Sequence, residues 1–396
     1  MTARPGLTPP LLGVLSFLAA VGPFATDLYL ASFTEIARDL GAAPSSVQLT
    51  LTAFLIGMGA GQLVLGPLSD QLGRRPVLVW ALAVFAASSI VMVFSPNIAV
   101  FIALRLLQGV SGAAGVVVSR AIAVDLSEGA AAIRAISLIA MFVGLGPLLA
   151  PPIGGAILTL GDWRAVLAVL AGIATLMFLL AALFVPESLP HRARSSAGPA
   201  PALRSFGELL RDRRFLLLTC VFGLGFGGMM SYISASPFVG QSVLGMPPLL
   251  YSLAFAAGAA AMIVANMINA RLAGRVPAQR MMLIGTGIAL ASGLALAICG
   301  ATGTLSPALF IVCAFALTGG TGLNMSNASA VALLRAGESR GAGSALLGAS
   351  QFAVGGLASP VVGAWGEHTA LPMSLAVLVS SLLAFAGAAL YVRRTR

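Results

Sequence analysis

The sequence predicts an all-α polytopic membrane protein of twelve transmembrane helices, arranged as two six-helix halves that repeat one another. Composition is the first observation behind this prediction: of 396 residues, 59% are hydrophobic and 9% are charged, whereas soluble domains carry about 25% charged residues. The second is that the apolar residues form long unbroken runs, which excludes a membrane barrel with its short alternating segments. The third is a loop signature that occurs twice.

Twelve apolar segments follow one another, each long enough to cross the roughly 30 Å hydrocarbon layer of a bilayer. In the first half the predicted spans are Leu11–Phe33, Val47–Ser69, Pro76–Phe94, Ile98–Ala123, Ile133–Leu160 and Arg164–Val185. In the second half they are Phe215–Gly240, Leu249–Arg271, Gln279–Gly300, Leu305–Leu334, Gly341–Trp365 and Leu371–Val392.

A polar stretch separates the sixth span from the seventh. It divides the chain into an N-terminal half of residues 1–185, a linker of residues 186–214 and a C-terminal half of residues 215–396. The linker holds six arginines, and within it Phe206–Arg213 is expected to form a short helix on the membrane surface.

Arginines set the expected orientation. The formal net charge is +10 and the chain contains no lysine. The arginines concentrate in the even-numbered loops and at both ends of the chain, a bias typical of the cytoplasmic side. We therefore expect a multi-pass protein of the cell membrane with both termini in the cytoplasm. Charges placed in this way do not indicate a nucleic-acid partner.

Motifs of enzymes, cofactors and metal sites are absent from the sequence. It has no H-E-x-x-H, no G-x-S-x-G and no phosphate-binding G-x-x-x-x-G-K-[ST]. His191 and His368 are too isolated to bind a metal, and the three cysteines lie within apolar runs.

The loop signature covers residues 66–78, with the sequence G-P-L-S-D-Q-L-G-R-R-P-V-L. Gly66, Pro67 and Gly73 are turn formers, which predicts that the preceding apolar helix ends here. The pattern G-x-L-x-D-x-x-G-R-R-x-x-L resembles the loop between the second and third helices of major facilitator superfamily transporters. A generic positively charged loop is the alternative.

Asp70 lies across the Gly73 turn from Arg74 and Arg75, so its carboxylate can sit between a helix end and a guanidinium. The resemblance implies that these residues form an inner gate with Asp125, at the end of the fourth helix. A solvated Asp125 is the alternative. The corresponding loop of the second half, Asn269–Arg275, keeps the glycine and the arginines but lacks the aspartate.

Paired halves of this kind imply a substrate site between them, near the midplane.

Asp27 is the only acidic residue well inside an apolar span. A carboxylate in hydrocarbon is costly and is usually functional, so Asp27 is the candidate proton carrier. The alternative is a residue just below the headgroups that pairs with water or Arg38.

Arg105 places a guanidinium inside the fourth span, with Gln108 on the same helical face and Gly109 and Gly112 available for close helix packing. The segment resembles the fourth-helix signature of the superfamily, in which the arginine is tied to proton transfer. A purely structural arginine bonded to backbone carbonyls is the alternative.

The fifth span contains a run rich in glycine and proline, which predicts a bent helix with a flat face of small residues. It resembles the superfamily signature of proton antiporters, which would favour export over import; a kinked packing helix is the alternative. The residues that carry the signature are Gly144, Gly146, Pro147, Pro151, Gly154 and Gly155.

Three further segments resemble the Bcr/CflA group of drug exporters: Thr26–Leu30, the pair Trp163-Arg164, and Gly341–Phe352 with the glycines that follow it. The group exports bicyclomycin, phenicols and related drugs. Its Thr-Asp-Leu-Tyr-Leu motif is usually followed by Pro-Ala, but here Ala31–Phe33 intervenes.

Polar, aromatic and methionine side chains within spans are candidates to line the substrate cavity. Interhelical hydrogen bonds explain the Asn and Gln residues equally well. The candidates are Tyr29, Gln108, Met230, Tyr232, Asn324, Asn327 and Gln351.

Together these features predict a monomeric secondary transporter that exports a small, largely apolar drug or natural product in exchange for protons. A proton-coupled importer of a small metabolite and a non-transporting sensor on the same fold are the alternatives.

Overall fold

In the computed structural model, residues 6–127, 129–190, 200–337, 340–363 and 369–395 are described. Residues 191–199 of the predicted linker, which include His191, lie outside these ranges, as do Trp365 and His368. Residues cluster into two compact units. The first contains the chain up to Leu40 and from Ala53 to Ala197, and the second contains Gly41–Thr52 and the chain from Gly198 onward.

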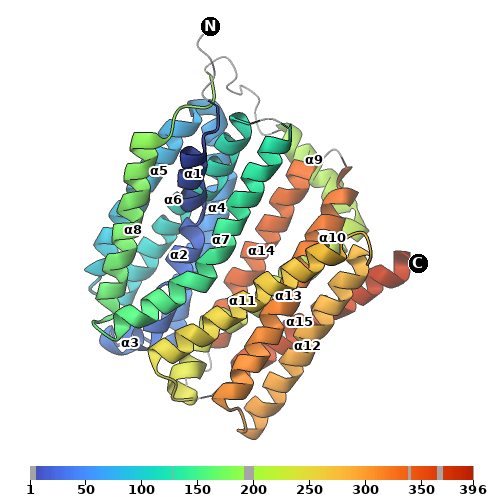
Figure 1. Ribbon diagram of the computed structural model, residues 1–396. Helices are drawn as coiled ribbons and strands as arrows, with labels where there is room; N and C mark the ends of the chain where they lie inside the picture. Colours follow the sequence, from blue (N-terminus) through green and yellow to red (C-terminus); the bar gives the residue numbers. More distant parts are fainter. Residues whose placement is uncertain (1–5, 128, 191–199, 338–339, 364–368, 396) are drawn as a thin grey trace. The chain divides into compact units, whose positions relative to one another are not determined.

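The first unit contains eight helices among its described residues (Figure 1), with the N-terminal part of α4 belonging to the second unit. Helix α5 packs against both α6 and α8, while α1 and α2 pack against α6 and α7. The helices are α1 (Pro9–Ala19), α2 (Val21–Asp27), α3 (Phe33–Asp39), α4 (Pro44–Leu72), α5 (Arg74–Val93), α6 (Ile98–Asp125), α7 (Gly129–Leu158) and α8 (Trp163–Phe184).

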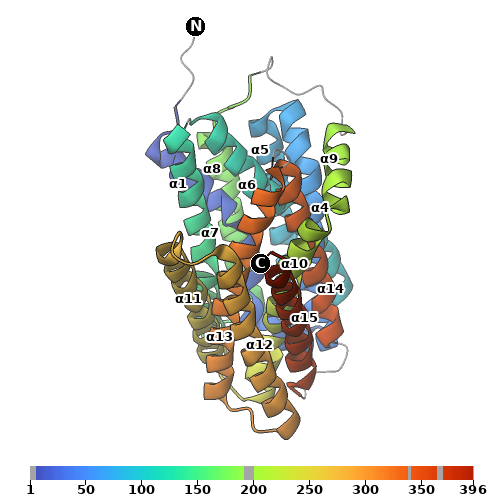
Figure 2. The same ribbon diagram turned by 90° about the vertical axis from the view of Figure 1, so that its right-hand side faces the viewer.

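The second unit contains seven helices in the part of the chain that the structure describes, and α12, α13 and α15 are seen side by side in Figure 2. Helix α10 packs against α13, α14 and α15, and it continues into a π-helical turn, Val239–Val243. The helices are α9 (Ala200–Arg211), α10 (Arg213–Phe238), α11 (Pro248–Leu272), α12 (Ala278–Thr302), α13 (Pro307–Arg335), α14 (Arg340–Gly363) and α15 (Leu371–Thr395).

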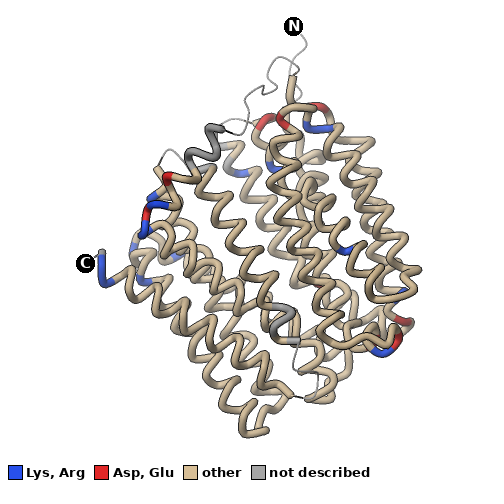
Figure 3. Tube along the Cα trace, turned by 180° about the vertical axis from the view of Figure 1, so that it is seen from behind, with Lys and Arg blue, Asp and Glu red and all other residues tan. Residues whose placement is uncertain are grey.

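Eleven segments of the described chain are long and apolar enough to cross a membrane, and α14 adds a shorter apolar stretch, Ala342–Ala358. Each predicted span therefore corresponds to a helical segment, and the predicted all-α membrane fold is confirmed. Charged residues lie mainly at helix ends, with long uncharged stretches between them (Figure 3).

The first predicted span, Leu11–Phe33, was expected to be one helix, but it is broken. Helix α1 ends at Ala19, α2 ends at Asp27, and a short 3-10 turn follows at Leu30–Ser32. Pro23 explains the first break, because its ring lacks an N–H and clashes with the carbonyl of residue 19 in a continuous helix. Because α2 ends at Asp27, the last carbonyls of this helix are left for other donors.

The second helix continues past its predicted end at Ser69. Helix α4 includes Pro67 and ends at Leu72, because a single missing N–H is tolerated where neighbouring helices support the backbone. The chain turns only at Gly73, whose φ of 107° suits glycine.

A helix in the predicted linker is confirmed, but α9 ends at Arg211, since Asp212 caps the next helix.

Candidate functional site

Arg105 lies on α6 with no exposed surface. One terminal nitrogen donates to the Ala25 carbonyl at 2.9 Å and to Gln108 Oε1 at 2.5 Å, and the other donates to the Tyr29 hydroxyl at 3.1 Å. The guanidinium carbon also lies 4.4 Å from the ring centre of Tyr29 and 4.5 Å from that of Phe54. Two aromatic faces and three oxygen acceptors therefore stabilise the cation.

A second layer of hydrogen bonds orients Gln108. Its amide nitrogen donates to Ser89 Oγ at 2.7 Å, and Ser89 donates to the Phe85 carbonyl at 2.6 Å. The amide oxygen of Gln108 is thus left facing Arg105. Ser89 and Phe54 carry no motif of their own, so the sequence alone did not identify them.

No ion pair between described residues involves Arg105, and its Nε has no hydrogen-bond partner. A buried charge is costly unless it is compensated. Here the compensation comes from neutral groups.

Asp27, at the end of α2, is 5% exposed, and its Oδ1 accepts a hydrogen bond of 2.8 Å from Thr26. Its carboxylate forms no ion pair with any described residue, Arg38 and Arg105 included. Arg105 instead contacts Ala25 and Tyr29, two residues before and two after Asp27. Arg105 therefore bonds to the segment that carries Asp27 but not to Asp27 itself.

Helix α7, which carries the glycine- and proline-rich signature, packs on this stretch. A Cβ atom added to Gly146 would clash with Pro23, and one added to Gly154 would clash with the Leu28 carbonyl oxygen. Gly144 has open space around it. Two of the signature glycines are therefore required by close contact with the segment around Asp27. The prolines Pro147 and Pro151 lie within the helix, and Gly155 is buried.

The predicted close approach at Gly109 and Gly112 is confirmed. An added Cβ on Gly109 would clash with the Phe54 carbonyl of α4, and one on Gly112 would press on the ring of Phe85 in α5. This packing holds α4 and α5 against the helix that carries Arg105.

Arg74, Asp70 and Asp125 form what we call the gate cluster. Arg74 contacts Asp70 Oδ1 at 2.6 Å and Asp125 Oδ2 at 3.1 Å, and it donates to Ser69 Oγ at 2.7 Å. The start of α5, the end of α4 and the end of α6 are joined by one guanidinium. Arg75 lies outside the cluster and donates to the Ala182 carbonyl of α8 at 2.8 Å.

Glu187 supports the gate cluster from a distant part of the chain. Its carboxylate accepts hydrogen bonds from the backbone N–H groups of Arg74 at 3.0 Å and Arg75 at 3.3 Å, which caps the start of α5. Next to it, Ser188 donates to Asp125 Oδ2 at 2.9 Å. Sequence analysis missed both residues, because more than 100 positions separate Glu187 from its partners.

The opposite end of the first unit has its own charged cluster, which involves the Trp163-Arg164 pair. Asp39 Oδ2 accepts from Trp163 Nε1 at 2.9 Å and from Arg164 at 2.6 Å. The Arg164 guanidinium also stacks on the Trp163 ring, 4.2 Å from its centre. These contacts join the end of α3 to the start of α8.

In the second unit, polar side chains join helices through neutral hydrogen bonds. Asn324 donates to the Val221 carbonyl of α10 at 3.2 Å, and Asn327 donates to Asn269 of α11 at 2.9 Å. Ser326 forms a similar bond with Asn266 at 2.7 Å. Asn324 and Asn327 were candidates either to line the cavity or to form interhelical hydrogen bonds, and the structure contains the interhelical bonds.

The remaining candidates of the second unit lie in its interior or at its partly covered surface. Tyr232 is 2% exposed and stacks on Phe255 at 6.1 Å between ring centres, and Met230 is also buried. Gln351 on α14 is half-buried.

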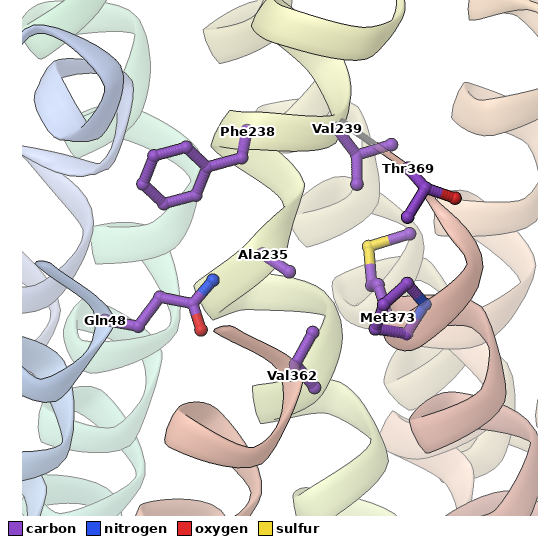
Figure 4. A pocket seen from close by; sticks show the side chains of 8 residues that line it. Gln48, Ala235, Phe238, Val239, Val362, Thr369 and Met373 are labelled. Atoms are coloured by element: carbon purple, nitrogen blue, oxygen red, sulfur yellow. The ribbon is translucent and has the colours of Figure 1, made fainter. Parts of the chain in front are cut away.

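Figure 4 shows a pocket in the second unit. Its accessible volume is about 10 Å³, which is the room of a single water molecule and too small for a drug. Its lining comes from Gln48, Ala235, Phe238, Val239, Val362, Thr369, Pro372 and Met373.

The sequence profile of the Major Facilitator Superfamily matches residues 15–360. The uncharacterized MFS-type transporter YdgK of Bacillus subtilis is 36% identical over 93% of this chain and 92% of its own length. The bicyclomycin resistance protein homolog of Haemophilus influenzae is 33% identical over 94% of each chain. Among solved structures, a bacterial homolog of the human lysosomal transporter Spinster superposes with a TM-score of 0.78 at 15% identity, covering 98% of this chain and 99% of that one.

The last of these similarities concerns the fold alone, whereas the profile and the sequence relatives identify the family. Eleven long apolar helices among the described residues agree with it. The chain is a multi-pass membrane protein that belongs to the major facilitator superfamily, and its relatives place it in the Bcr/CflA group.

Proposed function

We propose that the protein exports small, largely apolar drugs or natural products across the plasma membrane in exchange for protons, by alternating access. The observation that carries this proposal is that a fully buried Arg105 on α6 donates to Ala25 and Tyr29, the residues that flank the buried Asp27. Ionisable groups inside membrane spans are costly and typically belong to ion or proton pathways.

The direction and the substrate class rest on the relatives and on the antiporter signature. The Haemophilus influenzae relative bears the name of a bicyclomycin resistance protein homolog. The signature glycines of α7 contact the segment that carries Asp27, which suits a helix that responds to the state of that carboxyl group. The distribution of arginines supports cytoplasmic termini, and in this role the protein is a monomeric transporter rather than an enzyme.

Asp27 carries the exchanged proton in this mechanism. When Asp27 is ionised, the cation that the mechanism assigns to it is Arg105, which donates to Ala25 and Tyr29 on either side of Asp27 in the sequence. When Asp27 is protonated, Arg105 is held by the Tyr29 and Phe54 rings and by the oxygens of Ala25 and Gln108. Arg105 can thus remain charged in both states.

The gate cluster acts on the cytoplasmic side. Arg74 joins three helix ends through Asp70 and Asp125, so any movement that separates α6 from α5 must break its contact with Asp125. Glu187 and Ser188 extend the cluster to the segment after α8.

Proton release tests the proposal. Purified wild-type protein in weakly buffered detergent solution is mixed with bicyclomycin and with phenicols, and the pH change is followed. We expect drug-triggered release from the wild type and none from Asp27→Asn, which keeps the shape of the side chain but has no titratable proton.

Asp162→Asn is the matched control. Asp162 is exposed and caps α8 by accepting from the Ala165 N–H at 3.0 Å, a role that asparagine fills equally well. It should release protons as the wild type does. Release that persists in Asp27→Asn contradicts the role of Asp27. Drug uptake along with protons in vesicles contradicts export.

A further inference from the structure

Among the described residues, five exposed arginines of the α9–α10 junction and the end of α15 are not used by the proposed transport mechanism. Figure 3 shows blue segments in this region near the C-terminus. We call them the basic surface: Arg211, Arg213, Arg214, Arg393 and Arg394.

A common hydrophobic core holds the basic surface together. Leu209 of α9, Phe215 of α10 and Tyr391 of α15 are buried in one cluster. The Arg214 guanidinium also donates to the Arg394 carbonyl at 3.4 Å. The arginines therefore project from a packed scaffold rather than from independent tails.

Acidic residues do not neutralise the basic surface. Asp212 lies between Arg211 and Arg213, but its Oδ2 pairs with Arg335 at 2.5 Å and its Oδ1 accepts from the N–H groups of Arg214 and Phe215. Among the ion pairs between described residues, none involves any of the five arginines. With Glu208 as the acidic side chain of α9, the local charge stays strongly positive.

The basic surface also lies where the membrane spans end. One candidate span begins at Arg213 and others end at Arg335 and Arg394, so the five arginines lie at span boundaries, where lipid headgroups are expected. Leu210, beside Arg211, is 49% exposed, as suits a side chain at the boundary with the acyl chains. An arginine fork matches the oxygens of a phosphate group.

From this geometry we propose that the basic surface binds the headgroup phosphate of an anionic phospholipid in the leaflet that faces it. Phosphatidylglycerol, with one net negative charge, fits this surface, whereas zwitterionic phosphatidylcholine gains far less. The role is independent of the exchange of drugs for protons.

Binding of fluorescent phosphatidylglycerol to the full-length protein in phosphatidylcholine nanodiscs tests the proposal. The test variant is Arg211→Gln/Arg213→Gln/Arg393→Gln, which leaves the Arg214–Arg394 contact in place. Each arginine near an anionic surface contributes about a fivefold gain in affinity, so the triple variant should bind about a hundredfold more weakly.

The control is Arg271→Gln/Arg275→Gln/Arg280→Gln, which removes three exposed arginines around the α11–α12 loop of the same unit. It should lower the affinity far less than the test variant does, because these arginines belong neither to the α9–α10 junction nor to the end of α15. A triple Arg→Lys variant at the test positions keeps the charge but not the fork, so it should bind more tightly than the Gln variant and more weakly than the wild type, which separates loss of binding from loss of folding.

Three outcomes overturn the proposal. In the first, the wild type is found to bind phosphatidylglycerol no better than phosphatidylcholine. In the second, the control variant is found to lose as much affinity as the test variant. In the third, inorganic phosphate at millimolar concentration releases the lipid, so that the surface is a site for small anions.

Discussion

The two units differ in what they place inside their membrane spans. In the first unit, Asp27 and Arg105 put ionisable groups into the buried interior, and the gate cluster joins three helix ends through one guanidinium. In the second, interior polar contacts are made by amides and hydroxyls such as Asn327 and Ser326. The two halves of one fold thus differ in chemistry: the first buries ionisable groups, and the second forms neutral hydrogen bonds among its described residues.

This difference indicates that charge chemistry and helix packing can be assigned to separate halves. Neutral hydrogen bonds between membrane helices are individually weak, whereas a buried charge with several partners tolerates few changes. Substitutions in the first unit should therefore affect transport most, and those in the second should affect mainly stability.

The largest effect on stability is expected from Gly154→Ala, because the added Cβ meets the Leu28 carbonyl, which is backbone and cannot move aside. Overpacking typically costs about 1–3 kcal/mol, and this case lies at the upper end. Its counterpart in the second unit, Gly225→Ala, meets the end of the Asn324 side chain and should cost less.

The measurement is the melting temperature of each variant in detergent. Gly144→Ala, where nothing lies within 4 Å of the added atom, serves as the control and should match or exceed the wild type. If Gly154→Ala has the same melting temperature as Gly144→Ala, α7 does not need its close contact with Leu28.

Arg105→Lys should have the next largest effect, on drug–proton exchange. A lysine cannot reach Ala25, Gln108 and Tyr29 together in the planar arrangement of a guanidinium. Losing one hydrogen bond to a charged group costs about 1.5–3 kcal/mol, so drug–proton exchange should fall at least about tenfold while expression persists. Exchange rates from proteoliposomes provide the check, and a wild-type rate would make Arg105 a structural residue.

Arg335→Gln tests the ionic pair of the second unit. Hydrogen bonds from Arg335 and from two backbone N–H groups outweigh the effect of burial and lower the pKa of Asp212 below its ordinary value. A lowered folded-state pKa gives stability that is present above the unfolded-state value, about 3.9, and lost as pH falls through the folded-state value.

Because both side chains are about one-third exposed, the pair contributes up to about 1 kcal/mol. Wild type and Arg335→Gln should differ in melting temperature at pH 7 and converge as the pH falls below about 3.9 and through the lowered folded-state pKa of Asp212. Arg275→Gln is the control. A difference that does not shrink as the pH falls contradicts an ionic contribution.

Asn327→Ala should have the smallest effect. Hydrogen bonds between membrane helices contribute about 0.6 kcal/mol on average, so the melting temperature should fall slightly while the KM for drug stays within twofold. A several-fold rise in KM with unchanged stability would instead assign Asn327 to the substrate site.

Sequence reasoning succeeded where the signal is local. The spans follow from composition, and Arg105, Gln108 and Gly109 lie on one helix, so their spacing predicted the contacts that the structure contains. The predicted end of the second helix, Ser69, fell short of Leu72, because the tolerance of a membrane helix for the hydrogen bond missing at Pro67 depends on its neighbours.

Other features depend on contacts that no spacing reveals. Phe54 faces Arg105 from another helix, and Ser89 reaches Gln108 from a third. Pro23 was visible in the sequence, but nothing in the sequence shows that α2 ends at Asp27 or that Arg105 donates to the Ala25 carbonyl there.

The cap that Glu187 places on α5 also has a consequence for biosynthesis. Arg74 and Glu187 are 113 residues apart, and ribosomes add about 5–20 residues per second. The first turn of α5 therefore waits roughly 6–23 seconds for its acidic cap. Until the segment after α8 has been made, the N–H groups of Arg74 and Arg75 lack this cap, so the support that Glu187 gives to the gate cluster arrives only when synthesis of the first half has ended.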